Sequence, residues 1–294
     1  MPLVTPFDPW NSPLCHCPPK YSFSPYTGCS HRCLYCYITS YIPNAFDCRP
    51  KDRLLERLGR EIRRLDRRIP ITIASSSDPY IPMENSTNLT RDALRLLTRS
   101  GFKVLLVTKS NLVTRDVDII KRARCSISMT ITTLQIEIAK LLEPLATSPD
   151  KRLEAIKALT EANIPCSVRI DPIIPGINDD LEQLEPLVKE VAAAGAKHIV
   201  ASSYKAKADN FKRMISVFPD LRDRLERTYW AEGEAKGRAR YAPYSFRRPL
   251  LEELKRIVES RGSTFATCRE GFSDLNSGKT CDGTHLIPER LNTA

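Results

Sequence analysis

The sequence has no run of about 18 consecutive uncharged apolar residues, which a membrane-spanning helix would need. Its first six residues, Met1 to Pro6, lack the positively charged and apolar regions of a secretory signal peptide. Internal repeats and low-complexity tracts are also missing. We therefore expect a cytoplasmic protein with no membrane partner.

The chain is long enough and apolar enough for a substantial core, with 294 residues of which 41% are hydrophobic. An α/β barrel of this length can be a single unit. The net charge is +10, from 45 basic and 35 acidic side chains. A basic surface attracts polyanions, so nucleic acid is a possible partner. The alternative is a solvated Lys and Arg surface without any such role.

Short apolar, β-branched runs alternate with longer charged segments of helical periodicity. This alternation predicts a parallel sheet, as a partial (βα)6 barrel of TIM type or a doubly wound sheet. Functional groups should then lie at the carboxyl ends of the strands. The expected strands are 21–24, 71–75, 104–108, 126–131, 166–170 and 198–202, and the helices between them are 53–67, 90–100, 115–123, 134–142, 151–163 and 180–194.

Three segments are expected from the composition. A Pro-rich lead-in covers residues 1–20, and the barrel core covers residues 21–204. From residue 205 the rhythm changes to charged helical segments and a loop-rich end. We interpret residues 205–294 as a helical and loop extension that packs on the core, and we expect a monomer.

The strongest local signal is the motif GCSHRCLYCY at residues 28–37, which places Cys29, Cys33 and Cys36 at C-x3-C-x2-C spacing. One loop with this spacing can hold three corners of an iron–sulfur cubane and leave the fourth iron open. A zinc site would need a fourth ligand, for which His31 lies in a cramped position. A redox dithiol would need only two cysteines. The spacing therefore favours a cluster.

This motif resembles the signature of radical S-adenosylmethionine (SAM) enzymes. Other segments resemble the subgroup related to spore photoproduct lyase, and the resemblance covers about residues 20 to 285. They are SPYTGC at 24–29, DPYIPME at 78–84, TKS at 108–110, LEP at 142–144, DPIIPG at 171–176 and CREG at 268–271.

The resemblance implies a [4Fe-4S] cluster that binds SAM at its open iron and cleaves it reductively. The products would be methionine and a 5′-deoxyadenosyl radical, which takes a hydrogen atom from the substrate. An electron donor of ferredoxin or flavodoxin type is then implied as a partner. The sequence assigns no residue that acts on the substrate itself.

Candidate SAM contacts follow from the motif and from the rule that sites lie at strand ends. Tyr35 would contact the adenine. A polar segment ends the second expected strand, Lys109 ends the third as a cation for the SAM carboxylate, and Arg169 is an alternative carboxylate partner. The remaining candidates are Ser75, Ser76, Ser77 and Asp78 near the methionyl amine, and Ser128 and Thr130 near the ribose.

Four further cysteines lie outside the expected core: Cys15, Cys17, Cys268 and Cys281. Disulfides are rare in a reducing compartment, so we expect a second metal site, either an auxiliary iron–sulfur cluster or zinc. His16 or His285 could replace one ligand, and the alternative is a set of scattered thiols. Cys125 and Cys166 lie at expected strands and are interpreted as core residues, or otherwise as hydrogen-atom donors.

The sequence departs from spore photoproduct lyase in one respect. That family has a hydrogen-donor cysteine after the second strand, whereas residues 75–78 read SSSD, so the lyase reaction is not expected. The first hypothesis is a radical enzyme acting on nucleic acid or a nucleobase. It draws on basic and aromatic stretches at 204–207, 210–213, 238–241 and 244–248. The others are a radical enzyme acting on a protein or small metabolite, and a non-catalytic iron–sulfur or zinc protein that binds nucleic acid.

Overall fold

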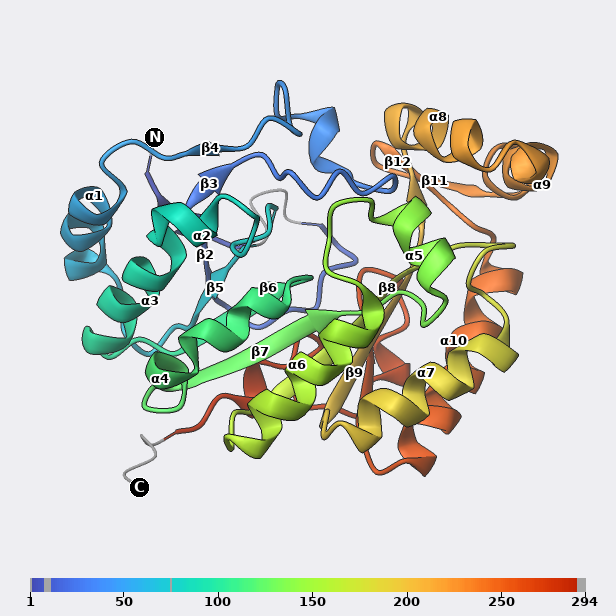
Figure 1. Ribbon diagram of the computed structural model, residues 1–294. Coiled ribbons are helices and arrows are strands. Elements are labelled where there is room, and N and C mark those ends of the chain that lie inside the picture. The colour runs from blue at the N-terminus through green and yellow to red at the C-terminus, as the bar shows by residue number, and fades with distance from the viewer. Residues whose placement is uncertain (1, 8–11, 75, 290–294) are drawn as a thin grey trace.

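Eight strands form one sheet in the computed structural model, which describes residues 2–7, 12–74 and 76–289 (Figure 1). The strands run in sequence order across the sheet. All neighbours are parallel except β1, which is antiparallel to β2. The strands are β1 (Val4–Pro6), β2 (Tyr21–Phe23), β5 (Ile71–Ile73), β6 (Val104–Thr108), β7 (Cys125–Thr130), β8 (Cys166–Ile173), β9 (His198–Ser203) and β13 (Thr264–Thr267).

Helices follow the parallel strands, as the alternation predicted. The six expected strands correspond to β2, β5, β6, β7, β8 and β9, so the partial (βα)6 barrel is confirmed. Within the described residues the edge strands β1 and β13 are not paired with each other, so the barrel is open. The helices are α1 (Leu54–Glu61), α2 (Glu84–Thr87), α3 (Leu89–Arg99), α4 (Val117–Ile120), α5 (Ile136–Leu142), α6 (Pro149–Glu161), α7 (Leu181–Ala193), α8 (Ala208–Val217), α9 (Arg222–Glu226) and α10 (Tyr244–Ser260).

Two strands of the main sheet come from the expected extensions. The lead-in supplies β1, and the C-terminal segment supplies β13, which pairs in parallel with β9. The sheet therefore crosses both boundaries predicted at residues 20 and 204. The remaining strands make two small sheets, one of β10 (Lys205–Ala206), β12 (Ala239–Tyr241) and β11 (Glu234–Lys236), and one of β3 (Tyr26–Thr27) and β4 (Arg49–Pro50).

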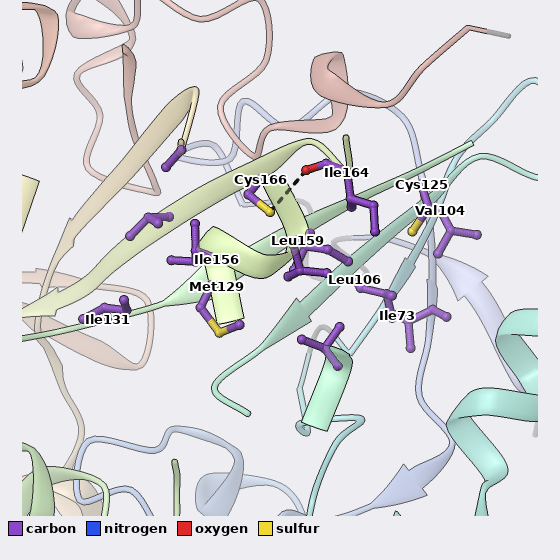
Figure 2. Packing of buried hydrophobic residues seen from close by; sticks show 14 of the residues in the cluster. Ile73, Val104, Leu106, Cys125, Met129, Ile131, Ile156, Leu159, Ile164 and Cys166 are labelled. Carbon is purple, nitrogen blue, oxygen red and sulfur yellow. Dashed lines mark hydrogen bonds between the residues drawn. The ribbon is translucent and has the colours of Figure 1, made fainter. Parts of the chain in front are cut away.

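The main core lies between the sheet and the helices that cover its outer face. Alternate strand residues such as Leu106 and Met129 are fully buried there against Leu159 of α6 (Figure 2). Cys125 and Cys166 belong to the same apolar cluster, and the Cys166 thiol donates to the Ile164 carbonyl at 3.5 Å (Figure 2). Both cysteines are therefore core residues that face the helices.

The intervening strand residues face the inside of the open barrel, because successive side chains of a strand point to opposite faces. Ser128 is in register with Ser167, and Thr130 with Arg169, so all four share this inner face. The buried hydroxyls of Ser128 and Thr72 have no hydrogen-bond partner within the described residues. The inner wall therefore offers polar groups that are open to a ligand.

A buried ionic network holds the C-terminal extension to the sheet. The Glu270 carboxylate accepts from Lys205 at 2.7 Å, from Arg247 at 2.9 Å and from the Ser203 backbone at 2.7 Å. Glu270 and Arg247 are completely buried. Burial would raise the pKa of Glu270, but Lys205 and Arg247 hold it below its ordinary value of 4.5.

None of the described helices is long and apolar enough to cross a membrane.

Replacing Glu270 with Gln should lower the free energy of unfolding by about 3–5 kcal/mol at pH 7, because two cations lose their buried counter-charge. The folded-state pKa lies below the unfolded value, so this contribution is present above pH 4.5 and lost as the pH falls below it. The deficit of the variant should therefore shrink in acid. Urea unfolding of both proteins across pH 3–8 measures it.

The matched control is Glu253→Gln, which breaks a surface pair with Arg256. Its effect should stay within about 1 kcal/mol. An equal loss in both variants would contradict the role of the buried network.

Candidate active site

The loop that carries the three motif cysteines follows β3, and we call residues 28–37 the cluster loop. Cys29 and Cys33 are buried and Cys36 is half-buried. The loop begins at Gly28, which has φ = 81°, and a Cβ there would lie 2.6 Å from the Ala45 carbonyl oxygen. Cys29 N–H donates to that same oxygen at 2.7 Å. Only glycine permits this approach of the two backbones.

The three motif thiols lie close together in sequence, on one short loop. A structural zinc site is closed by four ligands, whereas a cubane can be held at three of its corners. Three thiols on one short loop fit the corners of a larger iron–sulfur cluster.

Helix α8 of the C-terminal extension holds the cluster loop from outside, and the two lie side by side in Figure 1. Arg213 donates from Nε to the Leu34 carbonyl at 3.1 Å and from Nη2 to the Cys36 carbonyl at 2.8 Å. Asn210 donates to the Tyr35 carbonyl at 3.2 Å. Three consecutive carbonyls of the loop are thus satisfied by one helix.

A charged group of side chains lies against Cys33. Glu143 at the end of α5 pairs with the buried Arg152 of α6, and it accepts a hydrogen bond from the Tyr35 hydroxyl. Burial would raise the pKa of Glu143, but Arg152 and Lys109 hold it below its ordinary value. Tyr35, the expected adenine contact, is therefore anchored through its hydroxyl, and its ring lies under Lys109 at 5.6 Å.

Lys109 follows β6, as the sequence predicted, and its ammonium makes no hydrogen bond or ion pair within the described residues. Burial would lower its pKa, but Cys33, Glu143 and Asp78 raise it above the ordinary value. Lys109 is therefore a cation at neutral pH, next to a cluster thiol, with its donors open to a ligand.

Most of the described polar side chains after β5 form hydrogen bonds within the protein. Asp78 accepts from the Lys109 N–H at 2.6 Å and from the Thr108 hydroxyl at 2.7 Å, and its Oδ2 lies 3.6 Å from His31 Nδ1. The Ser77 hydroxyl donates to the Tyr26 carbonyl. Ser75 lies outside the described residues, and Ser76 lies within hydrogen-bonding reach of Tyr41.

The candidates on β7 and β8 lie together on the inner face. Ser128 Oγ is buried without a partner among the described residues, and Thr130 is its neighbour two positions on. Arg169 pairs with Asp171 at 2.6 Å and also contacts the Cys268 thiol. Both Arg169 and Cys268 therefore belong to the carboxyl end of the barrel.

The four outlying cysteines do not form one ligand set. Cys268 follows β13 and its N–H donates to Ala201, near the end of β9. The Cys281 carbonyl lies by His198, at the start of β9. Cys281 instead contacts Cys17, with the two sulfurs 3.4 Å apart, and the Cys15 thiol forms a hydrogen bond with Cys17. In this arrangement Cys268 lies apart from Cys15, Cys17 and Cys281, and the second metal site stays a prediction.

The sequence matches the radical SAM superfamily over residues 23–191. The chain belongs to the radical SAM superfamily. An uncharacterized Mycobacterium tuberculosis protein, Rv2578c, is 26% identical over 259 residues, which cover 82% of this chain and 74% of the relative. A radical SAM Nα-GlyT isomerase of Pseudomonas phage M6 is 23% identical over 84% of this chain and 53% of its own length.

Among solved structures, spore photoproduct lyase complexed with dinucleoside spore photoproduct aligns with a TM-score of 0.66. The identity is 16%, and the match covers 83% of this chain and 75% of that one. This likeness supports the partial barrel fold. The predicted membership of the superfamily, and with it an enzyme, is confirmed by these comparisons.

The residues present fit the cofactors that the superfamily implies, a [4Fe-4S] cluster and SAM. Three thiols of one loop supply the cluster ligands. Within the described residues, two candidate polar atoms are buried without a hydrogen-bond partner: His31 Nδ1 in the cluster loop and Ser128 Oγ on the inner face of β7. Buried polar atoms without partners are rare and point to a missing ligand.

Sequence reasoning missed the residues that hold the site in place. Arg213 and Asn210 bind carbonyls more than 170 positions away, and Arg152 reaches Glu143 from the next helix. The sequence predicts only a nucleic-acid contact for the basic stretch 210–213. No local signal distinguishes a helical arginine that binds a loop from one that faces water.

Replacing Arg213 with Gln should accelerate iron loss from the cluster loop to a chelator roughly tenfold, because two charge-assisted hydrogen bonds to loop carbonyls are lost. The control is Lys212→Gln, which removes the same charge from an exposed neighbour on α8. Iron release followed by absorbance measures both. Equal rates in the two variants would show that charge alone, and not the carbonyl contacts, matters.

Proposed function

We propose that this enzyme cleaves SAM reductively at a [4Fe-4S] cluster held by Cys29, Cys33 and Cys36. The bound cluster would supply the electron, and the 5′-deoxyadenosyl radical formed from SAM would take a hydrogen atom from substrate. The observation that carries the proposal is the cluster loop itself: Cys29 and Cys33 are buried, Cys36 is half-buried, and the Lys109 ammonium lies 5.6 Å from the ring of Tyr35 in the same loop.

The chain's own residues would bind and orient SAM. Lys109 would bind the SAM carboxylate, and Arg169 on β8 is the alternative cation. Ser128 and Thr130 would contact the ribose, and the Tyr35 ring and backbone the adenine. Ser75, Ser76, Ser77 and Asp78 would lie near the methionyl amine. Asp78, which already accepts two hydrogen bonds, mainly orients Lys109 and the turn after β5.

The substrate we propose is a nucleic acid or a nucleobase. Tyr37 and Tyr41 expose 46% and 42% of their surface just beyond the last cluster cysteine, with ring centroids 6.2 Å apart. The Lys207 ammonium lies 5.9 Å from the Tyr37 ring. Exposed rings beside a cation suit base stacking and phosphate contact. The similar spore photoproduct lyase, complexed with dinucleoside spore photoproduct, supports this class.

Anaerobic reconstitution followed by SAM and dithionite should yield 5′-deoxyadenosine from the wild-type protein, with about four irons per chain. The triple variant Cys29→Ala, Cys33→Ala, Cys36→Ala should bind no cluster and form no product. The matched control removes Cys15, Cys17 and Cys281 together and should retain both. Zinc in place of iron, or product formation by the first variant, would overturn the proposal.

Tyr37→Ala should weaken binding of single-stranded DNA or RNA by about fivefold or more, because one stacked base is lost. Wild-type affinity should fall as salt rises. Fluorescence anisotropy at several salt concentrations measures both effects. The control is Leu55→Ala, an exposed apolar side chain of α1. Salt-independent binding, or an equal effect of the two variants, would instead favour a protein or small-metabolite substrate.

A further inference from the structure

The two edges of the open barrel are not joined by strand pairing. At the amino ends of the strands, they are connected by contacts between the N-terminal lead-in and the C-terminal end of the chain. We call residues 276–289 the C-terminal tail. A Cβ at Gly283 of this tail would lie 2.8 Å from Ser167 Oγ, near the start of β8. Asp282 pairs with Lys20, the residue before β2, and both are buried. The tail therefore crosses from the β13 side of the sheet to the β2 side.

Two thiols lie at this junction, one from each edge. Cys281 of the tail is buried and Cys17 of the lead-in is half-buried. Their sulfurs are 3.4 Å apart, and the residues are 264 positions apart in sequence. A disulfide bond is about 2.05 Å long, so the sulfurs would need to approach by little more than 1 Å. A third thiol, that of Cys15, forms a hydrogen bond with Cys17.

The surroundings favour a neutral disulfide over a metal ion. The Lys20 ammonium lies close enough to Cys17 and Cys281 to interact with both, and it repels a further cation. Asp282 is already neutralised by Lys20. A disulfide carries no charge and needs no counter-ion in this buried position.

We propose that Cys17 and Cys281 form a reversible disulfide that closes the open barrel at its amino end. The oxidant is a low-molecular-weight disulfide of glutathione type. The half-exposed Cys17 loses its proton and attacks that disulfide, releasing one thiol and leaving a mixed disulfide. Cys281 then loses its proton and displaces the second thiol. Two protein thiols are oxidised, and one small disulfide is reduced to two thiols.

The local chemistry makes this exchange slow near neutral pH. The hydrogen bond with Cys15 lowers the pKa of Cys17, but the hydrogen bond from Cys281 and burial outweigh it and raise the pKa to about 12. Only a small fraction of Cys17 is thiolate at pH 7, so closure should accelerate as the pH rises. The bridge would restrict the unfolded chain over almost its whole length. It lies at the opposite end of the barrel from the cluster loop, so the proposal does not rest on the proposed function.

The test equilibrates the anaerobic, cluster-loaded protein in glutathione buffers of increasing oxidised fraction. Alkylation and non-reducing peptide mapping should identify a Cys17–Cys281 peptide. The melting temperature of the oxidised form should exceed that of the reduced form by roughly 5–15 °C. Cys17→Ser and Cys281→Ser should each abolish the peptide and the shift, and Cys15→Ser should retain both. If the Cys17→Ser or Cys281→Ser variant fails to fold, the glutathione titration of the wild-type protein still shows whether the disulfide forms.

Three outcomes would overturn the proposal. One is a Cys15–Cys17 or Cys268 disulfide in place of the expected peptide. Another is a fully reduced pair at every glutathione ratio and at pH 9. The third is one metal ion per chain that Cys17→Ser releases while the iron of the cluster loop is retained.

Discussion

The coverage of only one face of the sheet by helices is the constraint on which the rest of the structure depends. Outward residues such as Ile127 and Val168 must be apolar because they pack on α6 and α7. The residues between them are free to be polar, and Ser128, Ser167 and Arg169 occupy those positions. Because the strands are parallel, their carboxyl ends bring Thr130, Arg169, Lys109 and the cluster loop to one edge of the sheet.

Charge compensation then connects distant parts of the chain. Glu143 pairs with Arg152, and the charge of Glu143 also raises the pKa of Lys109, so these buried groups stay ionised away from water. Arg213 of α8 donates hydrogen bonds to two carbonyls of the cluster loop that the loop itself leaves without a partner. The C-terminal extension is thus part of the support of the active site, and Glu270 in turn holds that extension to β9.

The two ends of the barrel have different tasks. The carboxyl end gathers the thiols, the cations and the open hydroxyls that suit chemistry on SAM. The amino end is filled by the lead-in and the C-terminal tail, whose buried Lys20–Asp282 pair and adjacent thiols fasten the edges that the strands leave apart. An open barrel needs such a fastening, because its edge strands cannot satisfy each other.

Local pattern alone determined the six parallel strands, the helices between them, the cluster loop and the position of Lys109 at a strand end. Periodicity and C-x3-C-x2-C spacing are properties of contiguous residues, so a single sequence carries them. Tertiary structure decided that β13 joins β9, that Arg213 binds the cluster loop, and that Cys17 meets Cys281 while Cys268 stays beside Arg169. These contacts join residues 66 to 264 positions apart, and their geometry depends on how the whole sheet curves.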